Sequence, residues 1–205
     1  MCEKCDSSVF GLVYDEKAVG FDLLPITARQ INLAKKCCRD ALEALKVMHT
    51  KGFVHLDVKP ENILCKNGEG RLADFGNTFK ANTKLPPIGT SGYLSPEHLD
   101  AHSKNKSIVS DPKMDIYSFG MTLLMILYPQ LASGLRQAQY DAEDAYWAKE
   151  AIVKYHSVLD DVRESLVNSN DPMDAFIASM LDPDPQTRID SQQALATFNT
   201  LLGNE

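Results

Sequence analysis

Two short stretches decide the fold: residues 55–62, which read His-Leu-Asp-Val-Lys-Pro-Glu-Asn, and residues 74–76, which read Asp-Phe-Gly. The segment between them carries Asn67-Gly68, a dipeptide that favours the tight turn of a β-hairpin. Such a hairpin would bring the two stretches side by side. Together they supply carboxylates, an amide and an ammonium group, which is the chemistry needed around a metal ion and a phosphate.

The remainder of the chain is predicted to be mainly helical, with a few short strands. Apolar residues recur at intervals of three and four from residue 27 to residue 51, and Gly52 supplies a helix end. Residues 115–127 are apolar on nearly every side, which predicts a buried helix. Further helices are predicted at 141–167, 172–181 and 191–202, strands at 9–14, 18–21, 63–66 and 71–73, and an ordered loop at 74–97.

The composition favours a globular, intracellular protein with one domain. The chain has 205 residues, of which 44% are hydrophobic and 24% charged, and its net charge of -7 argues against nucleic acid or an anionic membrane as partner. The longest apolar run, residues 119–128, is too short to cross a bilayer. The five cysteines form no disulfide framework, and Cys2 and Cys5 alone do not complete a zinc site. We therefore expect a cytoplasmic protein, located in the host cell if its source is a virus or an effector.

The two stretches resemble the catalytic loop and the Asp-Phe-Gly magnesium motif of eukaryotic-type Ser/Thr protein kinases. Three further segments are similar to this family in the same order: Gly-Thr-Ser-Gly-Tyr-Leu-Ser-Pro-Glu at 89–97, Asp-Ile-Tyr-Ser-Phe-Gly at 115–120 and Asp-Pro-Gln-Thr-Arg at 184–188. The resemblance implies an α+β, mainly α fold: the C-terminal lobe of a kinase. On this interpretation residues 1–205 are a single truncated kinase domain, with N-lobe strands and a hinge at 1–25 and the C-lobe at 26–205.

The resemblance also assigns roles to individual residues. Asp57 would accept or orient the proton of the substrate hydroxyl, and Lys59 would stabilise charge on the transferred phosphoryl group. The cofactors would be ATP and Mg²⁺. The residues expected to contact them are Asn62 and Asp74 at the metal ions, and Leu64 and Leu24 near the nucleotide base.

Other motif residues are predicted to be structural. The resemblance implies that Asp115 holds the backbone of the catalytic loop, that Glu97 and Arg188 form a buried ion pair, and that His55 and Phe75 stack in the core. The remaining histidines fall in no ligand-like pattern and are expected at the surface or at helix caps; they are His49, His98, His102 and His156.

The sequence departs from the family in two respects. Leu56 stands where the catalytic loop has an Arg that pairs with a phosphate, so phosphorylation of Thr78, Thr83, Thr90 or Ser91 is not expected to act through that pocket. In addition, the residues before Leu24 contain no Gly-rich phosphate loop, no strand Lys and no helix Glu. ATP would then be held from one side, and transfer should be weak or depend on a partner.

Three functions stay open at this point. The first is a Ser/Thr kinase acting on a protein substrate; the second is a pseudokinase or lobe mimic that binds another kinase or its substrate; the third is a scaffold with inert catalytic residues. An apolar upper face at Leu23, Leu24 and Leu64 favours association with a partner. Tyr146 and Trp147 belong to residues 128–170, where specificity would lie, and either pack on the lobe or anchor a partner.

Overall fold

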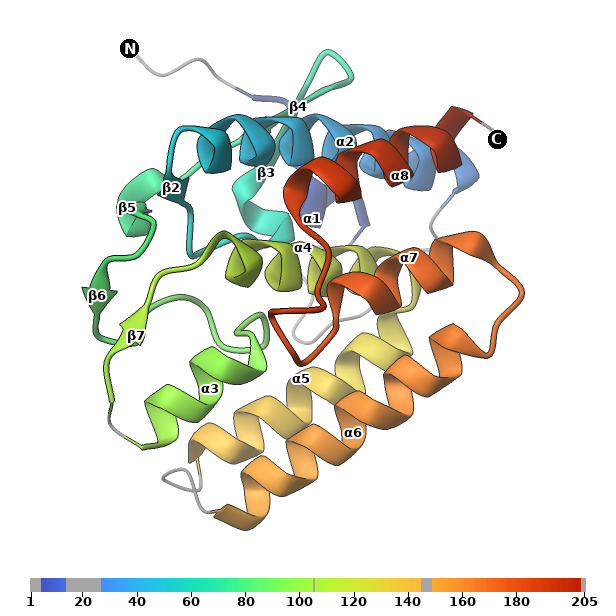
Figure 1. Cartoon of the computed structure of the whole chain (residues 1–205). Coiled ribbons are helices and arrows are strands. Elements are labelled where there is room, and N and C mark those ends of the chain that lie inside the picture. Colours follow the sequence, from blue (N-terminus) through green and yellow to red (C-terminus); the bar gives the residue numbers. More distant parts are fainter. Residues whose placement is uncertain (1–4, 14–26, 105, 145–148, 204–205) are drawn as a thin grey trace.

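Helices dominate the structure, a computed structural model that describes residues 5–13, 27–104, 106–144 and 149–203. The helices are α1 (Val9–Val13), α2 (Ala28–Thr50), α3 (Pro96–Ser103), α4 (Pro112–Leu127), α5 (Pro129–Asp144), α6 (Lys149–Val167), α7 (Pro172–Met180) and α8 (Ser191–Gly203). In Figure 1, α2 and α8 lie together at the top, α5 and α6 form a pair below, and α4 passes between these two layers.

The strands are short and all pair in antiparallel fashion. They are β1 (Ser7–Ser8), β2 (Phe53–Val54), β3 (Ile63–Lys66), β4 (Glu69–Leu72), β5 (Phe79–Lys80), β6 (Lys84–Leu85) and β7 (Ile108–Val109). One sheet has the order β1-β3-β4, and β2–β5 and β6–β7 are two-stranded. The predicted α+β, mainly α class is confirmed.

The helix α2 begins and ends where its sequence predicts. The Thr27 hydroxyl accepts a hydrogen bond from the Gln30 amide at 3.3 Å, and the Gln30 side chain accepts one from the Thr27 amide at 3.0 Å. This capping box satisfies two amides that the first turn leaves without helical partners. At the other end Gly52 takes φ +76°, a conformation that costs glycine little.

The hairpin between the two signature stretches forms as predicted and lies against α2. Asn67 and Gly68 both have positive φ, as a tight hairpin turn requires. On β4, a Cβ atom at Gly70 would lie 2.1 Å from the Cys37 carbonyl oxygen, so the two backbones touch. The Gly70 amide also donates to Asp40 Oδ2 at 2.8 Å. The hairpin is thereby fixed to the longest helix of the lobe.

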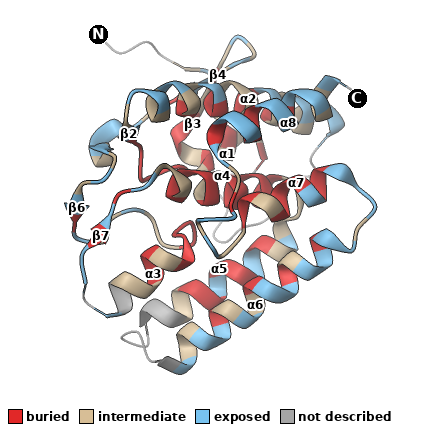
Figure 2. Cartoon of the chain, viewed as in Figure 1, coloured by how far each residue is buried: buried red, intermediate tan, exposed pale blue. Residues whose placement is uncertain are grey.

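The helix α4 is buried along nearly its whole length, as the red ribbon at the centre of Figure 2 shows. A Cβ atom at Gly120 would lie 2.9 Å from Met180 Cβ, so α4 and α7 approach at a distance that only glycine allows. The position of α7 against α4 therefore depends on the glycine at this place.

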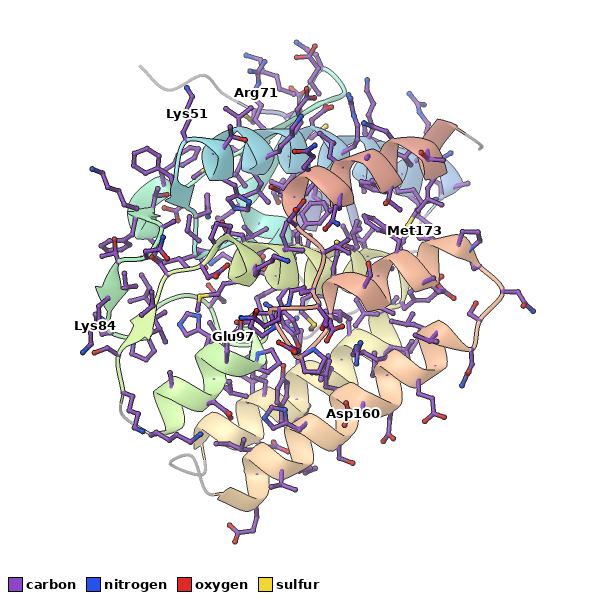
Figure 3. The ribbon with its side chains drawn as sticks, viewed as in Figure 1. Lys51, Arg71, Lys84, Glu97, Asp160 and Met173 are labelled. Atoms are coloured by element: carbon purple, nitrogen blue, oxygen red, sulfur yellow. The ribbon has the colours of Figure 1, made fainter. Side chains whose placement is uncertain are left out.

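A buried ion pair joins α3 to the segment before α8. Arg188 donates from Nη1 and Nη2 to the two carboxylate oxygens of Glu97, at 2.8 and 2.9 Å. The same guanidinium donates to the carbonyls of Lys113 and Asp182. In Figure 3, Lys51, Arg71 and Lys84 extend outward from the fold; the Glu97 side chain is 22% exposed and that of Arg188 is fully buried. The expected pair between Glu97 and Arg188 is confirmed.

The strand predicted at residues 9–14 is wrong, because residues 9–13 form the helix α1. Val9 and Val13 lie one helical turn apart and are both fully buried. The Ser8 hydroxyl accepts from the Gly11 amide at 3.1 Å, which is a helix N-cap bond. A short apolar run fits the spacing of a helix as well as that of a strand. The overlooked signal was Ser8, which caps the helix. The strand predicted at 18–21, Leu23 and Leu24 lie outside the described residues, and the boundary between 1–25 and 26–205 stays a prediction.

The single helix predicted at 141–167 is also wrong, because α5 and α6 are separate helices. Pro129 starts α5 at its first turn, a position that suits proline. The buried face of α5 includes the polar residues Arg136 and Gln139. Because these positions are not apolar, the helical spacing of buried residues could not be recognised from hydrophobicity. Tyr146 and Trp147 lie outside the described residues.

Within the described ranges, nothing indicates a disulfide, a metal cluster or a membrane span. Cys37, Cys38 and Cys65 are buried free thiols, and burial raises the pKa of the Cys38 thiol well above its usual range. This part of the chain holds no group of three or more Cys, His, Asp or Glu side chains arranged around a metal, and none of its helices is long and apolar enough to cross a membrane.

Replacement of Arg188 by Met should destabilise the protein by about 3–5 kcal/mol, since it leaves the Glu97 carboxylate without its partner in a mostly buried position. The matched control is Arg71→Met, which removes an exposed contact to Glu69 at 3.4 Å and should cost less than about 1 kcal/mol. Urea unfolding of the three proteins measures both effects. Equal losses for the two variants would contradict the structural role of the buried pair.

Candidate active site

The catalytic loop is held by the carboxylate of Asp115, on the first turns of α4. Asp115 is 1% exposed and accepts from the amides of His55 (Oδ2, 2.7 Å) and Leu56 (Oδ1, 2.7 Å). The loop needs this support, because Leu56 has φ +62°, which is unfavourable for a residue with a side chain. The expected role of Asp115 is confirmed.

Two of the histidines expected at the surface or at helix caps instead have side chains that are removed from solvent and hydrogen-bonded to distant groups. His49, near the end of α2, contacts Asp115 Oδ2 through Nε2 at 2.8 Å. His98 is buried on α3, and its Nε2 accepts from the Ile88 amide at 3.1 Å. The prediction for both residues is wrong, because no local pattern showed which distant polar groups they would meet. His156 is half-exposed near Asp100, and the side chain of His102 lies outside the description.

Asp57 lies at the centre of a polar cluster. Its Oδ1 accepts from the Thr90 hydroxyl at 2.6 Å, and its Oδ2 lies 3.1 Å from Lys59 Nζ. Lys59 Nζ also donates to the Thr90 hydroxyl at 2.7 Å. One acid, one ammonium and one hydroxyl therefore contact each other, with Asp57 buried and Lys59 partly open to solvent.

Asn62 joins this cluster from the short helical turn Pro60–Asn62. Its amide nitrogen donates to the Asp57 carbonyl at 2.8 Å and to Asp57 Oδ2 at 3.0 Å. Both bonds use the nitrogen, so the amide oxygen can serve a cation. The Asn62 carbonyl in turn accepts from the Ala73 amide at 2.9 Å, which continues the hairpin pairing. Asp74 thus follows directly on a residue bonded to Asn62.

The Asp74 side chain is exposed and turned toward its own loop. Its backbone has φ +58°, and its Oδ1 accepts from the Gly76 amide at 3.3 Å, which is long for such a bond. The hairpin places Asp74 beside the cluster, while within the described residues its carboxylate bonds to Gly76. The structure therefore brings Asp57, Lys59 and Asn62 into contact and places Asp74 next to them.

Phe75 contacts His55 as expected, but it does not lie in the core. The two rings meet edge to face, with centroids 5.3 Å apart, and the His55 ring also bonds through Nε2 to the Ala73 carbonyl. His55 is fully buried, whereas Phe75 is 54% exposed. The expectation that both stack in the core is wrong for Phe75, since none of the described elements covers its outer face.

Leu64 lies half-buried on β3, paired with Ser8 of β1 and Arg71 of β4. Its expected partner at the nucleotide, Leu24, lies outside the described residues. The contact of Leu64 with a nucleotide base therefore stays a prediction, and so does the apolar upper face that includes Leu23.

Leu56 belongs to a small apolar cluster separate from the main core. The buried residues of this cluster are Val54, Leu56, Leu85, Ile108 and Met114. The strand pair β6–β7 supplies two of them, so the segment after Asp-Phe-Gly is attached to the lobe by apolar contacts. An arginine at position 56 could pair with a phosphate here, and a leucine packs instead.

The sequence pattern missed two residues on α5, Arg136 and Gln139, which contact the loop after Thr90. Gln139 donates to the Leu94 carbonyl at 3.0 Å, and the Arg136 guanidinium lies 5.2 Å from the centre of the Tyr93 ring. No signal in the sequence could have found them, because each acts on a segment distant along the chain.

A mainly helical lobe that presents an Asp, a Lys and an Asn on one supported loop, beside an Asp-Phe-Gly turn, defines the protein kinase class. The family model described as protein kinase domain matches residues 11–198, and the chain belongs to this family. The described residues form the helical lobe of that fold.

Among known proteins, the chain is similar to the serine/threonine-protein kinase Kist of Homo sapiens, with 32% identity over 176 residues, covering 80% of this chain and 40% of Kist. It is also similar to the serine/threonine-protein kinase ELM1 of Saccharomyces cerevisiae, with 28% identity over 185 residues, covering 81% of this chain and 27% of ELM1. The chain therefore spans less than half the length of these relatives.

Replacement of Asp115 by Asn should destabilise the protein by about 2–4 kcal/mol and speed amide exchange at His55 and Leu56, because an amide group presents a donor to one of these buried N–H groups. The control is Asp111→Asn at the N-cap of the same helix, where Asn caps as well as Asp and the change should be within about 0.5 kcal/mol. Urea unfolding and hydrogen exchange measure the two effects. Unchanged exchange at both His55 and Leu56 in the Asp115 variant would show that the carboxylate does not hold the loop.

Proposed function

We propose that this chain catalyses Mg²⁺- and ATP-dependent transfer of a phosphoryl group to a serine or threonine hydroxyl of a protein. The observation that carries the proposal is the contact of Asp57 with Lys59 and Asn62, on one loop supported by Asp115, and with Thr90 of a later loop. Phosphoryl transfer depends mainly on positioning and on neutralising charge, and such a cluster supplies both.

Asp57 and Lys59 would act on the two reacting groups. Asp57 Oδ1 already accepts a hydrogen bond from an alcohol, that of Thr90 at 2.6 Å. A substrate hydroxyl in this place would be oriented by Asp57, which receives its proton as the new O–P bond forms and the bond to ADP breaks. Lys59 would neutralise charge on the phosphoryl oxygens.

Asn62 and Asp74 would hold the Mg²⁺ that accompanies ATP and neutralises its phosphates. An amide oxygen and a carboxylate are ligands that suit this hard cation, and Mg²⁺ commonly takes one or two carboxylates together with substrate phosphates. The described residues contain no cluster of three or more carboxylate, His or Cys ligands. We therefore expect Mg²⁺ to bind together with the nucleotide and only weakly alone.

We further propose that the transfer is weak or depends on a partner. Among the residues that the structure describes, none supplies a Gly-rich loop, a strand Lys or a helix Glu that would cover the ATP phosphates. Loss of one preorganised charge partner typically costs about 10²–10³ in rate, and loss of a whole clamp costs more. A partner that completes the nucleotide site would restore part of this loss.

The packing of Leu56 favours activity that does not require phosphorylation of the segment after Asp-Phe-Gly. Leu56, Leu85 and Ile108 hold this segment by apolar contact, and a phosphate gains nothing there. The protein substrate is the expected partner, and location in the cytoplasm stays a prediction.

The second candidate function is a pseudokinase or lobe mimic that binds another kinase or its substrate. Its specific support is the exposure of Phe75, a large aromatic side chain on the Asp-Phe-Gly turn. A partner lobe that packs on Phe75 would remove this apolar surface from water. The two candidates differ in whether the chain itself transfers phosphate.

The purified chain should show a rise in melting temperature with Mg-ATP and slow transfer of radiolabelled phosphate to a basic Ser/Thr protein. Asp57→Asn should abolish transfer, by at least about 10²-fold, because no group orients the hydroxyl. Asp74→Asn should remove most of the Mg²⁺-dependent rise in melting temperature. The matched control is Asp160→Asn, an exposed site on α6 that should change neither quantity.

Two outcomes separate the candidates. Transfer that Asp57→Asn eliminates supports the kinase. No melting shift and no transfer by the wild-type chain, together with saturable binding to a purified kinase that Phe75→Ser weakens, would overturn the kinase proposal and support the lobe mimic.

A further inference from the structure

The loop at residues 91–94, directly after Thr90, is held from both sides. From α4, the Ser118 hydroxyl donates to the Tyr93 carbonyl at 2.8 Å. The Tyr93 hydroxyl contacts Met125 Sδ, also on α4, at 2.7 Å. The opposite side of the loop is contacted by α5, a helix that the hydrophobic pattern did not reveal.

Gln139 of α5 binds two backbone groups of this loop. Its Oε1 accepts from the Gly92 amide, and its Nε2 donates to the Leu94 carbonyl at 3.0 Å. The residue is 2% exposed, so water does not replace either bond. One amide side chain thus satisfies a donor and an acceptor two residues apart, which fixes the conformation of the loop between them.

Arg136 and Tyr140 extend this contact along the same face of α5. The Arg136 guanidinium lies 5.2 Å from the centre of the Tyr93 ring and donates to the Tyr140 hydroxyl at 2.9 Å. The Tyr140 hydroxyl donates to the Ser91 carbonyl at 3.4 Å. Gly92 has φ +86°, and a Cβ atom there would lie 2.8 Å from Arg136 Nε. The loop and the helix therefore fit with no room for a side chain at position 92.

We propose that Gln139 is the positioning residue for the protein-substrate side of the active site. This inference rests on the proposed kinase function. Thr90 bonds to Asp57 and Lys59, so the residues that follow it border the place where a substrate hydroxyl must reach Asp57. By fixing Gly92 and Leu94, Gln139 sets the shape of this border and acts on the substrate without touching the reacting atoms.

The direct test is amide hydrogen exchange at Gly92 in the whole chain, measured by NMR. Gln139→Met removes both bonds and should speed Gly92 exchange about 10- to 100-fold. Gln139→Glu retains an acceptor for the Gly92 amide but turns an oxygen toward the Leu94 carbonyl, so its Gly92 exchange should lie between that of the wild type and that of Gln139→Met. The control is Gln137→Met, on the exposed face of the same helix, where Gln137 donates to Asp141 and Gly92 should be unaffected.

A second measurement links the loop to the substrate. If the wild-type chain transfers phosphate, Gln139→Met should raise KM for the protein substrate about tenfold or more while KM for ATP stays unchanged. An equal change in both constants, or Gly92 exchange equal to that of the Gln137 control, would overturn the proposal. If the wild type transfers no phosphate, the proposed kinase function is rejected by that result. The exchange measurement then decides by itself whether Gln139 positions the loop.

Discussion

The carboxylate of Asp115 is the interaction on which the site depends. It is removed from water and accepts from the amides of His55 and Leu56 and from the ring of His49. A buried charge is stable only when its hydrogen-bonding capacity is met, so the catalytic loop must remain in this conformation for the fold to tolerate Asp115. The strained backbone of Leu56 persists for the same reason. Catalytic geometry and fold stability are thus coupled through one side chain.

The helix α4 contacts both loops of the site and the helix α7. Asp115 fixes the catalytic loop, Ser118 and Met125 hold the loop after Thr90, and Gly120 allows α7 to approach. Because one helix supports both loops, the separation between Asp57 and the loop at residues 91–94 is set by the fold. On the opposite side, Gln139 of α5 holds the same loop through Gly92 and Leu94.

The parts of this structure that sequence could predict are those encoded locally. The Asn67-Gly68 turn, the capped helix α2 and the apolar helix α4 each follow from residues close together in the chain, and the family motifs placed Asp115 and the pair of Glu97 with Arg188. The helix α1 was mistaken for a strand because five residues fit either period. His49, His98 and Gln139 could not be placed, because their partners are 10 to 66 residues away and tertiary packing alone brings them together.

The most direct test of the account is a crystal structure of the chain with Mg²⁺ and a non-hydrolysable ATP analogue. The account predicts a metal ion bound by the Asn62 amide oxygen and the Asp74 carboxylate, with the terminal phosphate facing Asp57 and Lys59. It also predicts that the bonds of Asp115 to the catalytic loop are the same with and without nucleotide. A nucleotide bound elsewhere, or a catalytic loop that separates from Asp115 when nucleotide binds, would contradict it.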